Sequence, residues 1–340
     1  MKLGLVIPGI FRSFGTDVSQ HFIHKISPKA LFRALSRAKK ITDNQKASRL
    51  SLPWLGFSDK RFPWARLHAE SLGLTNDLGT QHWAYLSPIS FLIERTTLRL
   101  SGQAHWDFSE QDEENLVNTI RELLQEDGIK IFIAAPGLWL LHSETPIAVH
   151  NQHYYELILK DMLDKQAHVN STQWQGLLSE LQMLLFQHSV CQQRRANGQA
   201  DINGLWLWGA GEQIPEQTAT VKAWDAILCD NTSIQQYARH IGLPYYSLQD
   251  FPRIKDDSSI QNLLMADYSL LQPLAHADFP QWEKQLLQLM EAVIDDGLSL
   301  RGSITQVNVW TSEKHYYQIL PYQKYYFFKR TQSASQFLSD

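Results

Sequence analysis

The stretch that decides the fold is residues 188–211, HSVCQQRRANGQADINGLWLWGAG. Its second half holds an apolar run, residues 202–208, that ends at Gly209-Ala210-Gly211 and is typical of a buried strand followed by a tight turn. Before it, leucines recur at helical spacing over residues 174–188, which predicts an amphipathic helix. The stretch and the residues before it therefore predict a helix, a polar connection and a strand in succession, as in an α/β protein.

The same alternation of strands and helices extends in both directions along the chain. Strand-like runs lie at 3–7, 129–134, 226–229 and 244–247, and helical spacing is found at 116–124, 234–241 and 282–293. This order predicts an α/β core with a mostly parallel sheet, into which an α+β subdomain is inserted. We assign residues 1–65 and 175–340 to the core and residues 66–174 to the inserted subdomain.

The composition of the 340-residue chain is that of a globular protein, because 44% of its residues are apolar and 19% are charged. The formal net charge of −4 provides no basic surplus, so we expect no nucleic-acid partner. No apolar run approaches the roughly 18 residues of a membrane span, so no membrane association is expected. The two cysteines, Cys191 and Cys229, are typical of a reducing compartment and favour the cytoplasm.

Residues 188–211 resemble the archaeal-type cofactor-independent phosphoglycerate mutases. That family carries a stretch of the form His-Pro-Val-Asn-x-x-Arg-x-x-x-Gly-x-x-x-Ala-Asn-x-x-Trp-x-x-Gly-x-Gly. Eight positions match in one register, namely His188, Val190, Arg194, Gly198, Asn203, Trp206, Gly209 and Gly211, whereas Ser189, Cys191 and Ile202 depart from it. The resemblance is closer still to a group of proteobacterial proteins with mutase-like or pathogenicity-regulator names. It implies a bacterial protein with an alkaline phosphatase-like α/β core.

The resemblance also implies a two-metal site that this sequence does not reproduce. The family transfers a phosphoryl group through a phosphoserine beside two divalent metal ions, and its first strand ends in a metal-binding Asp-Gly pair. Here the pair is Pro8-Gly9, and a proline side chain cannot ligate a metal. The candidates for the serine are Ser48 and Ser51, although neither lies in the expected Gly-Ser-Asp setting, and a turn or cap residue is the alternative interpretation.

The late metal motifs of the family have the forms Asp-x-x-Gly-His and Asp-His. The nearest segment to the first is 266–278, ADYSLLQPLAHAD, in which Asp267, His276 and Asp278 are the candidate metal ligands. A polar surface loop is the alternative interpretation of this segment, and residues 307–317 contain no Asp-His pair.

The matching stretch also supplies candidate ligand-binding residues, each with a structural alternative. Arg194 could hold a phosphate, or it could be a solvated arginine after a helix. His188 and Asn203 could bind a ligand or hydrogen-bond loops around the core. The amides near Gly209 and Gly211 could approach an anion, or these glycines could permit a tight turn.

Two hypotheses about function follow. The first is a non-catalytic relative of the mutases, a pseudoenzyme that has lost the two-metal site. It would need no cofactor and would act as a binding or regulatory protein for an unknown protein or a phosphorylated small molecule. The second is an active phosphotransferase or phosphatase that uses Mn or Zn with rearranged ligands, for instance Asp267 and His276.

Overall fold

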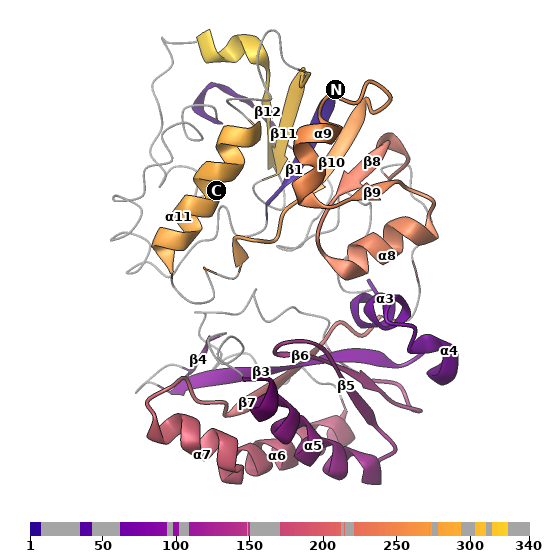
Figure 1. Cartoon of the computed structure of the whole chain (residues 1–340), viewed down its shortest axis with the longest axis vertical. Helices are drawn as coiled ribbons and strands as arrows, with labels where there is room; N and C mark the ends of the chain where they lie inside the picture. Colours follow the sequence, from indigo (N-terminus) through magenta and orange to yellow (C-terminus); the bar gives the residue numbers. More distant parts are fainter. Residues whose placement is uncertain are drawn as a thin grey trace. The chain divides into compact units, whose positions relative to one another are not determined.

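The computed structural model describes residues 1–7, 35–42, 62–93, 98–101, 109–147, 149, 171–211, 214, 221–271, 273, 278–293, 303–310 and 315–325. The chain consists of two compact units, each drawn in Figure 1. We call Met1–Ser58, Glu216–Asn231 and Tyr237–Asp340 the core unit, and Asp59–Pro215 with Thr232–Gln236 the insert unit. Within the described ranges, no helix is both long enough and apolar enough to cross a membrane.

The core unit is built on a seven-stranded sheet. Its order is β2 (Lys39–Thr42), β12 (His315–Ile319), β11 (Gln306–Trp310), β1 (Lys2–Val6), β10 (Asn262–Ala266), β8 (Ala226–Leu228) and β9 (Tyr245–Tyr246). The pairs from β11 through β1, β10 and β8 to β9 are parallel, whereas β12 pairs antiparallel with both β11 and β2. The predicted α/β class with a mostly parallel sheet is therefore confirmed.

The helices that follow the strands of this sheet pack on opposite faces of it. The short helix α9 (Phe251–Ile254) and α11 (Phe279–Met290) pack into one apolar cluster with strand residues such as Leu3 and Leu263, and α8 (Thr232–His240) contributes nothing to that cluster. Adjacent strand residues point to opposite faces. Accordingly, Arg239 of α8 stacks on Tyr245, whereas Arg253 of α9 stacks on Tyr246. The connections that follow β8 and β10 therefore cross opposite faces of the sheet.

The insert unit has an antiparallel sheet with helices packed against it. The strands are β3 (Trp83–Ile93), β4 (Leu98–Ser101), β5 (Lys130–Ala135), β6 (Leu138–His142) and β7 (Gly204–Trp208). They lie in the order β4-β3-β6-β5, and β7 pairs with β3. The helices are α3 (Trp64–Ser71), α4 (Thr75–Leu78), α5 (Glu110–Glu126), α6 (Thr172–Gln187) and α7 (Ser189–Ala196). Figure 1 shows α5, α6 and α7 side by side along one face of the sheet, where α5 and α6 share an apolar cluster with β6 and β7. In contrast, His68 of α3 contacts Tyr85, which points to the other face.

The insert unit extends further along the chain than the sequence-based division at residue 174. Strand β7 pairs antiparallel with β3, and Leu181 and Leu185 of α6 pack in the cluster of the insert unit. Residues up to 215 therefore lie in the insert unit, whereas the sequence places residues 175–215 in the core. The apolar run at 202–208 identifies a buried strand but contains no information about which sheet the strand joins.

A buried carboxylate holds the β5–β6 hairpin against α5. Ser109 caps α5 by accepting the amide of Asp112, and Glu113 in the first turn is 4% exposed. Its Oε1 atom accepts the Gly137 amide at 2.7 Å and the Trp139 indole N–H at 2.7 Å. Since Gly137 lies in the hairpin turn, this one side chain connects the helix to both the turn and the strand that follows.

Candidate functional site

The candidate site of the core unit is the carboxyl edge of its parallel strands. In α/β sheets, ligands bind at this edge where neighbouring strands send their connections to opposite faces, which here is between β8 and β10. Strand β8 leads into Cys229 and Asp230, and β10 leads into Asp267. The Asp267 amide donates to the carbonyl of Val6, the last residue of β1, at 2.9 Å. The residues after β8 and β10 thus share one edge of the sheet.

The thiol at this edge is chemically unreactive. Cys229 is fully buried, and burial, with smaller contributions from the charges of Asp230 and Asp267, raises the pKa of its thiol to about 12. The Asn231 amide donates to Sγ at 3.3 Å, which opposes this shift only in part. The thiolate is the form that attacks electrophiles and binds metals, so a thiol that stays protonated at neutral pH does neither.

The two carboxylates at this edge organise the loops around them. The Asp267 Oδ1 atom accepts the Ser269 amide at 2.8 Å, and the residue is 7% exposed. The Asp230 Oδ1 atom accepts the Ser247 hydroxyl at 2.9 Å and the Leu248 amide at 3.0 Å. Across the described residues, no group of three or more His, Cys, Asp and Glu side chains could hold a metal ion.

Of the remaining candidate metal ligands and nucleophiles, the structure describes Asp278. Asp278 is the N-cap of α11, and its Oδ1 atom accepts the Gln281 amide at 3.0 Å. His276, Ser48, Ser51 and the pair Pro8-Gly9 lie outside the described residues.

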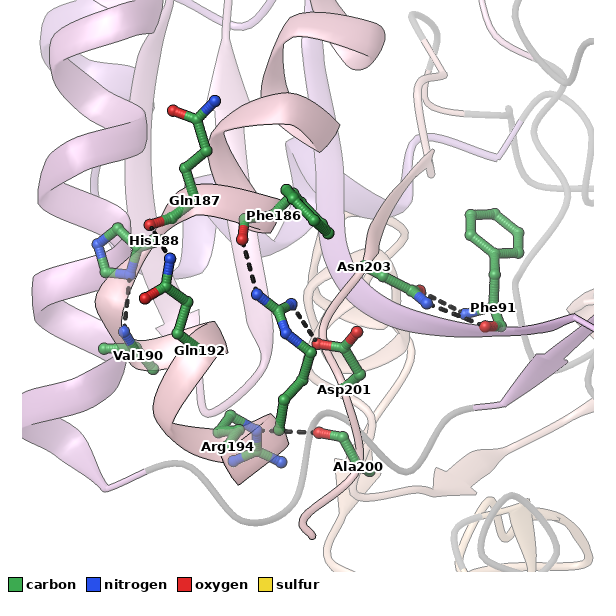
Figure 2. A network of polar contacts seen from close by, with 11 residues as sticks. Phe91, Phe186, Gln187, His188, Val190, Gln192, Arg194, Ala200, Asp201 and Asn203 are labelled. Carbon is green, nitrogen blue, oxygen red and sulfur yellow. Dashed lines mark hydrogen bonds and ion pairs between the residues drawn. The ribbon is translucent and has the colours of Figure 1, made fainter. Parts of the chain in front are cut away.

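The stretch 188–211 lies entirely in the insert unit, where its polar side chains join neighbouring elements (Figure 2). His188 caps α7, since its Nδ1 atom accepts the Val190 amide at 3.2 Å, and its Nε2 atom lies 3.1 Å from the Thr119 hydroxyl of α5. Arg194 is 4% exposed, and its Nε atom donates to the Ala200 carbonyl at 3.0 Å. These contacts hold α7 against α5 and against the chain that leads to β7.

Asn203 fastens the beginning of β7 to β3. Its Oδ1 atom accepts the Phe91 amide at 2.6 Å, and its Nδ2 atom donates to the Phe91 carbonyl at 3.0 Å (Figure 2). The strand ends at Gly209, which adopts a left-handed φ of +75°, and Gly211 follows it. All five ligand-binding candidates belong to the insert unit, and the hydrogen bonds of His188, Arg194 and Asn203 join elements of that unit.

A buried hydrogen-bonded cluster in the insert unit was not anticipated from the sequence. The Tyr85 hydroxyl lies 2.9 Å from His68 Nδ1 and 3.1 Å from the Ser233 hydroxyl, and both hydroxyls donate to the Trp64 carbonyl at 3.2 and 2.8 Å. Burial raises the pKa of Tyr85 far above its usual range and lowers the pKa of His68. All groups therefore stay neutral, which suits a structural cluster. Tyr85 and Ser233 are 148 positions apart, so no local pattern signals their contact.

The lowered pKa of His68 predicts that acid destabilises the insert unit. In the pH range between the folded pKa and the ordinary value of 6.5, the unfolded chain binds more protons than the folded chain. The stabilising contribution is therefore complete above pH 6.5 and is lost as the pH falls through the folded pKa. Urea unfolding of wild type and His68→Gln between pH 7.5 and pH 5 measures this loss. The variant should show a shallower pH dependence.

Some acid sensitivity should remain in the His68→Gln variant. Burial also lowers the pKa of His142 and of His188, so both favour the neutral folded state in the same way. Identical pH slopes in wild type and variant would contradict the role assigned to His68.

Solved structures that are similar to this chain include the two that follow. No protein-family model and no curated protein matches the chain. The PH0037 protein from Pyrococcus horikoshii has a TM-score of 0.47 at 12% identity, covering 94% of this chain and 87% of that chain. A cofactor-independent phosphoglycerate mutase from Thermoplasma acidophilum has a TM-score of 0.41 at 14% identity, covering 94% and 88%.

Proposed function

We propose that this chain is a phosphoglycerate mutase-like protein that has lost the two-metal phosphotransfer site and acts as a binding or regulatory protein. The proposal rests on the hydrogen bonds of Asp267 and Asp278, the two aspartates of segment 266–278 that the structure describes. Asp267 accepts the Ser269 amide, and Asp278 caps α11 through the Gln281 amide. Each of these oxygens is used within its own turn, and among the described residues neither aspartate belongs to a group of three or more His, Cys, Asp and Glu side chains that could hold a metal ion.

The resemblance of residues 188–211 supports the same proposal from the sequence. In that alignment Pro8 stands where the mutases carry a metal-binding aspartate at the end of their first strand. The first strand β1 lies beside β10, and β10 leads into the carboxylate of Asp267. A two-metal site needs several such ligands together, and we infer an alkaline phosphatase-like core without them.

The charge of the carboxyl edge favours a protein partner over a phosphorylated small molecule. Asp230 and Asp267 are acidic, and the thiol of Cys229 is neutral at physiological pH. A phosphate brought to this edge without a cation would be repelled by both carboxylates. We therefore propose a cofactor-free protein that recognises another protein, and we expect it in the cytoplasm of a bacterium.

Metal content and activity of the full-length protein test this proposal. The purified chain is incubated with Mn²⁺ or Zn²⁺, desalted and analysed by mass spectrometry, and turnover of 3-phosphoglycerate and of p-nitrophenyl phosphate is measured with and without Mn²⁺. We expect less than one bound ion per chain and rates equal to those of the Asp267→Asn variant. Metal-free 3-phosphoglycerate should leave the melting temperature unchanged.

The opposite result would establish the enzyme hypothesis. Two ions per chain, together with Mn²⁺-dependent turnover that Asp267→Asn abolishes, would mean that the chain is an active phosphotransferase or phosphatase. A rise in melting temperature with metal-free 3-phosphoglycerate would instead leave the loss of the metal site intact and overturn the choice of a protein partner.

A further inference from the structure

Helix α6 of the insert unit is apolar on two opposite sides. Its buried side holds Trp174, Leu177, Leu181 and Leu185. At 3.6 residues per turn, Met183 and Phe186 fall on the opposite side, where they are 65% and 71% exposed. These are the highest exposures of any large apolar side chains in the described part of the chain. A helix with apolar residues on both sides is typical of a helix that is covered on both sides.

The exposed side of α6 has the spacing of a helix-packing seam. Gly176, Ser179, Met183 and Phe186 follow one another at intervals of three, four and three residues, the spacing of the contact positions in coiled coils. We call these four residues the α6 seam. None of the four seam residues is charged. A charged partner surface would lose hydration over these four residues without gaining ion pairs from them, so the seam fits an uncharged partner.

The larger end of the seam is held in place before any partner binds. The Arg195 guanidinium lies 5.2 Å from the Phe186 ring centroid, donates to the Phe186 carbonyl and forms an ion pair with Asp201 at 3.0 Å. In Figure 2, dashed lines join the Phe186 carbonyl and Asp201 to the same guanidinium group. An exposed aromatic side chain that is already ordered loses less conformational entropy on binding than a free one.

The α6 seam is complementary to itself. Its N-terminal half is small, Gly176 and Ser179, and its C-terminal half is large, Met183 and Phe186. Nothing lies within 4 Å of the position that a Cβ atom on Gly176 would occupy, so there is room for a partner side chain. Two copies of α6 in antiparallel orientation would place the large half of each against the small half of the other. Parallel copies would place large against large.

We propose that α6 forms a symmetric antiparallel contact with α6 of a second copy of this chain, in which Phe186 of one copy packs over Gly176 of the other. A helix of sixteen residues is about 24 Å long. A single helix pair of that length buries less than the roughly 800 Å² per partner of a standard stable interface. The dimer is accordingly weak and concentration-dependent. It is independent of the proposed function, which concerns the core unit.

Sedimentation equilibrium of the full chain over a wide concentration range tests the dimer. Wild type should pass from monomer to dimer, and the double variant Met183→Gln/Phe186→Gln should weaken association by about a hundredfold or more, because apolar side chains are lost on both copies. The control is Leu287→Gln, which removes an equally apolar, 40% exposed side chain from α11 of the core unit and should not change association.

A third variant separates association from folding. Gly176→Gln should raise the stability of α6, since glycine is a poor helix former, while it fills the space that receives Phe186 and weakens the dimer. Wild type that stays monomeric at all concentrations would overturn the proposal. So would Gly176→Gln or the double variant associating as strongly as wild type.

Crosslinking locates the contact. Both native thiols, Cys191 and Cys229, are fully buried, and burial raises their pKa to about 11 and about 12, so they should not react with a short bismaleimide. Glu180→Cys introduces a thiol near the middle of the seam and should give a crosslinked dimer. Gln125→Cys on the exposed face of α5 should not. Equal crosslinking of both variants would contradict an α6 contact.

Discussion

Replacing Glu113 by alanine should lower the free energy of unfolding of the insert unit by about 3–6 kcal/mol, since two hydrogen bonds are lost and each hydrogen bond to a charged group contributes about 1.5–3 kcal/mol. The 4% exposed carboxylate accepts the Gly137 amide and the Trp139 indole N–H, both at 2.7 Å. In the alanine variant both donors would stay buried without this acceptor. Urea unfolding and the hydrogen-exchange protection of residues 130–142 measure the loss separately from the core unit.

Two control variants isolate the carboxylate of Glu113. Glu114→Ala removes the exposed carboxylate next in the same helix and should change stability by no more than about 0.5 kcal/mol. Glu113→Gln keeps an acceptor oxygen but no charge and should fall between the two alanine variants. If Glu113→Ala and Glu114→Ala were equally stable, the hairpin would not depend on this side chain.

The second large effect is expected at Gly209, the turn that ends β7. Its φ is +75°, and a Cβ atom there would lie 2.6 Å from Tyr85 Cδ2 and 3.3 Å from Trp64 Cβ. Gly209→Ala therefore combines a left-handed backbone, costing about 1–2 kcal/mol, with overpacking, costing about 1–3 kcal/mol. We expect a loss of about 2–5 kcal/mol in urea unfolding, the sum of these two costs, accompanied by a change in tyrosine and tryptophan fluorescence.

Gly198→Ala is the matched control because it shares the backbone strain but not the crowding. Gly198 has a φ of +67°, and nothing lies within 4 Å of its would-be Cβ atom. We expect its alanine variant to lose only about 1–2 kcal/mol, the backbone contribution alone. Equal losses at both glycines would mean that Tyr85 and Trp64 move aside at no cost and that packing does not require glycine at position 209.

Individual elements follow from local sequence patterns. The leucine spacing over 174–188 predicts a helix, and α6 spans Thr172–Gln187; the apolar run at 202–208 predicts a strand, and β7 spans Gly204–Trp208. The apolar run at 3–7 likewise predicts the strand observed as β1, Lys2–Val6. Periodicity reports which residues are buried on one side of an element, and this depends only on neighbours along the chain.

Strand partners and site geometry depend on contacts between distant residues. Nothing in residues 202–208 indicates antiparallel pairing with β3 rather than a place in the parallel sheet. The sequence therefore assigns residues 175–215 to the core, whereas in the structure they belong to the insert unit. In the same way, Asn203 and Arg194 are candidate ligand-binding residues from the sequence, but their atoms contact Phe91 and Ala200. A polar side chain binds whatever group folding brings to it, and the motif alone does not specify that group.

The amino-acid sequence by itself determined the α/β class, the positions of the main helices and strands, and the resemblance centred on residues 188–211. Those properties arise from local periodicity, turn residues and motif spacing. The tertiary structure decided that β8 and β10 bring Cys229, Asp230 and Asp267 to one edge, that Tyr85 meets Ser233, and that Met183 and Phe186 remain exposed on α6. Each of these required elements far apart in the chain to pack together, because only packing decides which side chains become neighbours.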